Sequence, residues 1–97
     1  DILAWLGQHK KENQVLCGFS METRDVLENS AAKLEKKNAD MIAANCLKES
    51  GAGFGTDTNH LSLISRNGVE DLPMLSKEAA ADKLLDALKI LLEARNT

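Results

Sequence analysis

The stretch VLCGFSMETRDVLENSAAKLEKKNADMIAA, residues 15–44, contains two short apolar runs separated by an amphipathic segment. The first run, residues 15–19, and the second, residues 41–44, have the length and composition of strands that are covered on both faces. Between them, residues 25–37 predict a helix that Thr23 or Asp25 can cap at its start and that Asn38 can end. Its expected inner face consists of Val26, Leu27, Ser30, Ala31 and Leu34. Strand, helix and strand in this order predict a right-handed crossover with the two strands parallel.

The segments on either side extend this unit. Residues 1–9 carry apolar side chains at helical spacing, and residues 61–64 predict a third strand. The dipeptide Asn67-Gly68 favours a tight turn, so residues 69–75 are expected to return antiparallel to the third strand. Pro73 lacks an amide hydrogen, which predicts that the returning segment lies at an edge of the sheet.

A final helix is predicted from Ser76, which can cap it, to about Ala94. Its expected inner face consists of Ala80, Leu84, Leu88 and Leu91. The predicted fold is therefore α/β, with a parallel βαβ core, a β-hairpin and a closing C-terminal helix. A complete doubly wound sheet commonly has about five or six strands, so residues 1–97 are interpreted as a single partial domain.

Charge and composition argue against several classes of function. Lys and Arg number 12 against 15 Asp and Glu, and a net charge of −3 disfavours nucleic acid as a partner. No apolar run approaches the roughly 20 residues that span a bilayer, so no membrane association is expected. Cys17 and Cys46 lack metal-ligand spacing, and His9 and His60 lie in unrelated contexts. We interpret the chain as cytoplasmic, with reduced thiols and no metal cluster.

Candidate binding residues follow the first predicted strand, because ligands of parallel sheets gather beyond the carboxyl ends of the strands. Gly18 would allow a ligand to approach the backbone closely. Phe19 stands at the rim, where its ring could stack on a base. The alternative is that Phe19 simply packs in the core, as most aromatic side chains do.

Lys33 and Lys37 are four residues apart on the predicted helix and therefore share a face. Two like charges at this spacing are mildly destabilising unless an anion or an acid bridges them. A triphosphate is one such anion, and Lys36 adds to the basic patch. The alternative is an ordinary solvated face with Glu35 nearby.

The run Gly51-Ala52-Gly53-Phe54-Gly55 is rich in glycine, but it has neither the GxGxxG spacing nor the lysine and hydroxyl of a P-loop. A turn network anchored by Asp57 and Asn59 explains it equally well. No arrangement of serine, histidine and acid in the sequence indicates a nucleophile.

Taken together, five stretches of the sequence resemble one enzyme family. They are DILAWL (1–6), VLCGFSMET (15–23), LENSAAKLEKKNADMIAAN (27–45), GAGFGTDTNHLSLI (51–64) and LPMLSKEAAADKLLDAL (72–88). Their order and spacing are similar to the C-terminal half of the CTP-using phosphopantothenate–cysteine ligases, also called phosphopantothenoylcysteine synthetases. In bacteria this ligase domain is usually fused behind a flavin-dependent decarboxylase, and the resemblance assigns FMN to that other domain, not to this chain.

The resemblance implies a Rossmann-like fold and a two-step reaction in coenzyme A biosynthesis. CTP would activate the carboxylate of 4'-phosphopantothenate as an acyl-cytidylate and release pyrophosphate, with Mg²⁺ or a similar divalent ion accompanying the nucleotide. The amine of cysteine would then attack to form the amide. The enzyme must neutralise the phosphates and hold the carboxylate in line with the α-phosphorus.

Carried over residue by residue, the resemblance implies that five positions contact the nucleotide. Asp1 and Ile2 match the end of the family's Asn-Pro-Asp-Ile segment, which also makes Asp1 the expected metal ligand. Phe19 matches the phenylalanine of a Gly-Phe-Ala-Ala-Glu-Thr motif beside the cytosine. Lys33 and Lys37 match two lysines that contact CTP. Catalytic residues are expected in the family's N-terminal half.

The sequence departs from the family pattern in three ways. Ser20-Met21 replaces the usual Ala-Ala, and Cys46 stands where many members have aspartate. The upstream half of the ligase domain, with its substrate loop and lysine-bearing flap, has no counterpart here. Three hypotheses therefore remain open: a part of the ligase that is inactive alone, a non-catalytic nucleotide-binding module, and an interaction module whose sheet edge forms a homodimer or pairs with the missing half.

Overall fold

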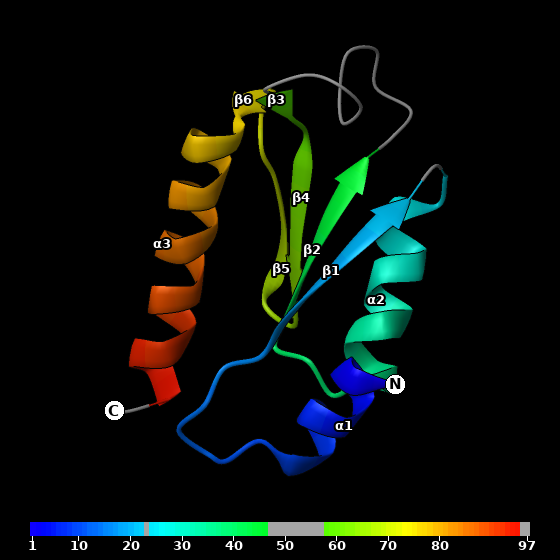
Figure 1. Cartoon of the computed structure of the whole chain (residues 1–97), viewed down its shortest axis with the longest axis vertical. Helices are drawn as coiled ribbons and strands as arrows, with labels where there is room; N and C mark the ends of the chain where they lie inside the picture. The colour runs from blue at the N-terminus through cyan, green and yellow to red at the C-terminus, as the bar shows by residue number, and fades with distance from the viewer. Residues whose placement is uncertain (23, 47–57, 96–97) are drawn as a thin grey trace.

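The computed structural model describes residues 1–22, 24–46 and 58–95 (Figure 1). Three helices are present in these residues: α1 (Ile2–His9), α2 (Val26–Lys36) and α3 (Lys77–Arg95). The strands are β1 (Cys17–Glu22), β2 (Met41–Cys46), β3 (Thr58–Asn59), β4 (Leu61–Ser65), β5 (Gly68–Asp71) and β6 (Leu75–Ser76). None of these helices is long and apolar enough to cross a membrane.

The main sheet has the order β1-β2-β4-β5. β1 and β2 are parallel and are joined through α2, which confirms the predicted βαβ unit. β4 runs antiparallel to β2 and forms the predicted hairpin with β5, so the sheet as a whole is mixed and its described strands contain one parallel pair. The returning strand ends at Asp71 and not at residue 75 as predicted, because Leu75 pairs with Asn59 in a second ladder. β3 and β6 form a separate two-stranded ladder beside the start of α3.

Helices cover both faces of β2, the strand with the most apolar sequence. Met41 and Ala43 pack on the face that carries α3, together with Ala80 and Leu84 of that helix. The alternate residues of β2, Ile42 and Ala44, pack on the other face against Leu34 of α2. Figure 1 shows the two helices on opposite sides of the sheet. This arrangement confirms that the second apolar run is a strand buried on both faces.

β1 differs from the prediction in its bounds and in its burial. It begins at Cys17, two residues later than expected, and continues to Glu22. As an edge strand it is covered on one face only, so Phe19 and Met21 are 70% and 63% exposed. Before the strand, the Leu16 carbonyl accepts the Asp40 amide at 2.8 Å, which ties this segment to the entry of β2.

α2 is rotated relative to the prediction. Val26, Ser30 and Leu34 face the sheet as expected, but Leu27 and Ala31 are exposed, so their assignment to the inner face was wrong. The helix packs mainly over β2 and β4, where Leu34 meets Ile42 and Ile64, and it buries only a narrow stripe at i, i+4 spacing. Leu27 and Ala31 lie beside that stripe, toward the β4–β5 hairpin, while Ser30 faces Ser20 of β1 with their hydroxyl oxygens 3.5 Å apart.

Two of the helix ends follow the predicted signals. Asn38 adopts a left-handed conformation with φ of 53° directly after α2. The Ser76 hydroxyl accepts the Ala79 amide at 3.1 Å and so caps α3. Asp25 occupies the N-cap of α2 without a capping hydrogen bond from its side chain, while Thr23, the other predicted cap, lies outside the described residues.

Candidate functional site

The structure brings Asp1 and Lys37 together, although they are far apart in the sequence. Lys37 is the C-cap residue of α2, and its Nζ donates to Asp1 Oδ2. The other carboxylate oxygen, Asp1 Oδ1, accepts the Ala4 amide at 3.2 Å and caps α1. Ile2 follows with 81% of its surface exposed. In the structure Asp1 is therefore both a helix cap and the partner of a lysine.

α1 is fixed beside α2 by a close backbone approach. Gly7 packs so tightly that a Cβ on it would lie 1.8 Å from the Lys37 carbonyl oxygen. The Gly7 carbonyl also accepts the side-chain amide of Asn38 at 2.9 Å. This contact explains why a glycine stands in a short helix. It holds the second half of α1 against the end of α2, while the Asp1–Lys37 pair holds the start of α1 there.

Lys33 is held by a carboxylate that the sequence analysis did not single out. Its Nζ donates to Glu22 Oε1 at 2.8 Å. Glu22 is the last residue of β1 and is 8% exposed. Its second oxygen accepts the Asn29 side-chain amide at 3.4 Å. The signal that could have found Glu22 is its strand period: Gly18, Ser20 and Glu22 share the face that α2 covers.

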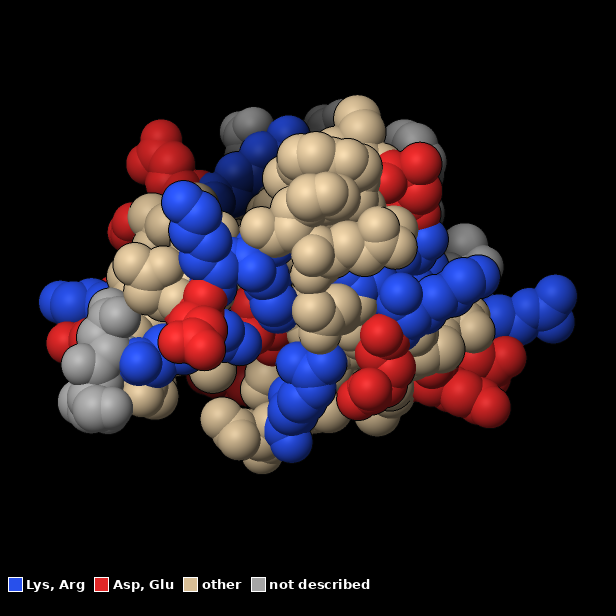
Figure 2. Space-filling view, turned by 90° about the horizontal axis from the view of Figure 1, so that it is seen from below, with Lys and Arg blue, Asp and Glu red and all other residues tan. Residues whose placement is uncertain are grey.

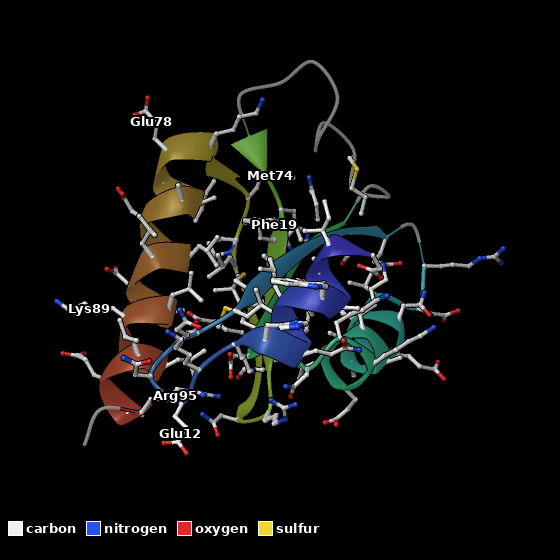
Figure 3. The ribbon with its side chains drawn as sticks, turned by 60° about the horizontal axis from the view of Figure 1, so that its bottom comes forward. Glu12, Phe19, Met74, Glu78, Lys89 and Arg95 are labelled. Carbon is white, nitrogen blue, oxygen red and sulfur yellow. The ribbon has the colours of Figure 1, made fainter. Side chains whose placement is uncertain are left out.

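Phe19 lies on the opposite face of β1 from Glu22. It pairs in register with Ala43, whose side chain packs on the α3 side of the sheet. The interpretation of Phe19 as a core residue is therefore wrong, because its ring stands open in solvent (Figure 3). It lines a hollow of about 260 Å³ between β1 and the first turns of α3. The other lining residues are Ser20, Met21, Asn45, Leu61, Lys77, Ala80, Ala81 and Leu84.

The predicted residues thus form two groups. Asp1, Ile2, Lys33 and Lys37 lie along α1 and α2 on one face of β1, and Phe19 lies on the other. A single ligand that contacts both groups must pass around β1, which is an edge of the main sheet in the described residues. The glycine-rich segment, residues 51–55, lies outside the described residues.

A second charged cluster lies around Asp40, which is 7% exposed. Its Oδ2 accepts the Lys10 Nζ at 2.9 Å and the Leu16 amide at 2.8 Å, while Oδ1 accepts Arg95 Nη2. Arg95 Nη1 also donates to the Glu12 carbonyl at 3.1 Å. Burial raises the pKa of Asp40, but the Leu16 hydrogen bond and the charges of Lys10 and Arg95 outweigh burial, so this pKa lies below its ordinary value.

The remaining chemistry of the described residues is limited. Burial raises the pKa of the Cys17 thiol to about 11, which leaves it protonated at neutral pH. No group of three or more His, Cys, Asp or Glu side chains in the described residues could hold a metal ion. On the face seen in Figure 2, basic and acidic side chains are interspersed. What this part of the chain offers a ligand is a lysine pair and an exposed aromatic ring.

Residues 1–91 match the family described as the DNA/pantothenate metabolism flavoprotein C-terminal domain. The chain belongs to this family. The resemblance inferred from the five sequence stretches is thereby confirmed at the level of the domain.

Curated relatives of this flavoprotein C-terminal domain include CoaBC proteins and a decarboxylase. The chain is 42% identical over 92 residues to the coenzyme A biosynthesis bifunctional protein CoaBC of Bacillus subtilis, covering 94% of this chain and 22% of the relative. It is 33% identical over 96 residues to CoaBC of Escherichia coli K12, covering 99% and 24%. A cysteine/cysteine sulfinic acid decarboxylase of an unknown prokaryotic organism is 44% identical over 93 residues, covering 94% and 26%. The chain thus spans about a quarter of these relatives.

Solved structures show the same relationship. The C-terminal domain of CoaBC superimposes with a TM-score of 0.81 at 43% identity, covering 97% of this chain and 45% of that one. The DNA/pantothenate metabolism flavoprotein of Streptococcus pneumoniae superimposes with a TM-score of 0.73 at 20% identity, which supports the fold alone. This chain therefore corresponds to less than half of the solved flavoprotein C-terminal domain.

Proposed function

We propose that the chain is the C-terminal half of a phosphopantothenate–cysteine ligase domain, in which it supplies phosphate-binding lysines and an aromatic surface for CTP. The observation that carries the proposal is the pair Lys33 and Lys37, side by side at the end of α2 within a domain of the CoaBC family. Both ammonium groups are near the surface, with side chains 43% and 20% exposed. They suit a triphosphate because a lysine is a compact, mobile point charge.

The proposed reaction joins 4'-phosphopantothenate and cysteine in two steps. The carboxylate attacks the α-phosphorus of CTP, which forms an acyl-cytidylate and releases pyrophosphate. The cysteine amine then attacks the acyl carbon, which forms the amide and releases CMP. In this scheme Lys33 and Lys37 neutralise the phosphates and favour the departure of pyrophosphate. The groups that hold phosphopantothenate and cysteine belong to the other half of the domain, so we expect this chain alone to be inactive.

The described residues do not form a divalent-ion site by themselves. Asp1, the predicted ligand, is a single carboxylate already paired with Lys37 and with the Ala4 amide. Mg²⁺ binding usually combines one or two carboxylates with substrate phosphates. Asp1 remains a predicted ligand, and no step is assigned to a metal in this chain.

The test is pyrophosphate release by the full-length protein that contains this chain, with 4'-phosphopantothenate and either CTP or ATP. Turnover with CTP is expected to exceed turnover with ATP. Equal or faster turnover with ATP would contradict the CTP assignment, and no pyrophosphate release with either nucleotide would contradict the ligase itself.

A second candidate is a self-association module, favoured by one observation. Phe19 and Met21 are exposed on an edge strand that has no proline and no lysine. Exposed apolar side chains beside an unpaired strand edge recruit other strands. Sedimentation of the 97-residue chain distinguishes the two proposals, because a homodimer that binds no CTP would favour the second.

A further inference from the structure

The two lysines of α2 are held by carboxylates of very different kinds. Asp1, the partner of Lys37, has a side chain that is 45% exposed. Glu22, the partner of Lys33, has a side chain that is 10% exposed and lies under α2. An exposed carboxylate can exchange a lysine for water at little cost. A buried one cannot, because losing its partner leaves an uncompensated charge away from solvent.

We propose that Glu22 is a positioning residue that fixes the Lys33 ammonium for an anionic ligand; this inference rests on the proposed function of the lysine pair. Glu22 Oε1 accepts one N–H of Lys33 at 2.8 Å. A lysine ammonium has three donors, so two remain for a ligand. The carboxylate lies on the buried side and Lys33 is 43% exposed, so these free donors are on the solvent side of the pair.

The energetic benefit is preorganisation. A lysine side chain has many rotamers, and a ligand that must select one of them loses affinity. In this protein the Lys33 rotamer is already selected during folding, when Glu22 is buried beneath Lys33. The carboxylate also offsets the repulsion between Lys33 and Lys37, which the i, i+4 spacing would otherwise impose.

A purely structural role for Glu22 would act through its other contact. Its Oε2 accepts Asn29 Nδ2 at 3.4 Å, a long hydrogen bond that also joins β1 to α2. Asn29 Nδ2 has a second acceptor, the Arg24 carbonyl at 3.2 Å. Asn29→Ala therefore removes the structural contact and leaves the Lys33–Glu22 pair in place, which separates the two roles.

The experiment is a double-mutant cycle on CTP affinity, measured by calorimetry on the full-length protein with Lys33→Gln, Glu22→Gln and the double variant. We expect each single variant to weaken binding about tenfold, which is about 1.4 kcal/mol. We expect the double variant to match Lys33→Gln within about twofold, because Glu22 acts through Lys33. Thermal unfolding of each variant shows that it is folded.

Glu35→Gln is the matched control. Glu35 lies on α2 between the two lysines in the sequence and pairs only loosely with Arg66 at 3.6 Å. Its replacement removes the same charge as Glu22→Gln, and the CTP affinity of this variant should equal that of the unmodified protein. Asn29→Ala should also retain CTP affinity. Three outcomes would each overturn the positioning role. They are unchanged CTP affinity in Glu22→Gln, additive losses of affinity in the double variant, and a tenfold loss of affinity in Asn29→Ala. Unchanged affinity in Lys33→Gln, or no CTP binding at all, would instead overturn the proposed function.

Discussion

Replacing Asp40 by asparagine should destabilise the chain severely. Asp40 is 7% exposed and connects three segments: the loop before β1, the entry of β2 and the end of α3. Asparagine is nearly isosteric and still accepts the Leu16 amide. It removes the charge that balances Lys10, whose side chain is only 11% exposed. Breaking one side of a buried ion pair costs about 3–5 kcal/mol, a large share of the roughly 5–15 kcal/mol that stabilises a typical domain.

The assay is urea unfolding followed by circular dichroism, with Asp82→Asn on the exposed face of α3 as the matched control. The control should stay within about 0.5 kcal/mol of the unmodified chain. A loss below about 1 kcal/mol for Asp40→Asn would refute the view that this cluster carries a buried charge.

The cluster around Asp40 should also make the stability of the chain depend on pH. The folded pKa of Asp40 is depressed, so its contribution is present above the unfolded pKa of about 3.9 and is lost as pH falls through the folded pKa. Stability of the unmodified chain should therefore decline more steeply below about pH 4 than that of Asp40→Asn. An equal decline of stability below about pH 4 in the two proteins would contradict a depressed pKa for Asp40.

Three further outcomes are expected. Gly7→Ala should lose about 1–3 kcal/mol in urea unfolding because its Cβ would meet the α2 C-cap carbonyl, whereas helix propensity alone predicts a gain of about 1 kcal/mol. In a Cys46→Ser background, Cys17 should react with a thiol reagent at pH 8 at least about 100-fold more slowly than free cysteine, since burial raises its pKa to about 11; a rate within tenfold would contradict this. Replacing Phe19 and Met21 by serine should weaken self-association in sedimentation while changing stability by less than about 0.5 kcal/mol.

Local patterns predicted the elements of the fold well. The Asn67-Gly68 turn and the Ser76 cap depend on nearby backbone, so the local sequence was sufficient to predict them. The apolar run at residues 41–44 was sufficient to predict β2. The facing of α2 was predicted less well. Leu27 has the spacing of a core residue, but whether it is buried depends on how the helix lies across the sheet. α2 packs over β2 and β4 along a narrow stripe, and Leu27 lies beside that stripe toward the β4–β5 hairpin. This placement is a property of the whole sheet and not of the helix sequence.

The candidate site was likewise predicted only in part. The spacing of Lys33 and Lys37 showed that they share a face and need a counter-charge. It did not show which acids supply that charge, because Glu22 and Asp1 reach the lysines from other elements, 11 and 36 residues away. Glu22 reads as the end of an apolar strand until its register with β2 shows which face it occupies.

The two edges of the main sheet, as far as the chain is described, are built differently. β5 is four residues long, has two acidic residues, Glu70 and Asp71, and is followed by Pro73. Short, charged strands next to proline resist pairing with other strands. β1 is six residues long and exposes Phe19 and Met21, with no such protection. The solved C-terminal domain of CoaBC, of which this chain covers 45%, has enough further sequence to cover that edge, so we expect both the rest of the proposed ligase domain and any self-association to involve β1 and not β5.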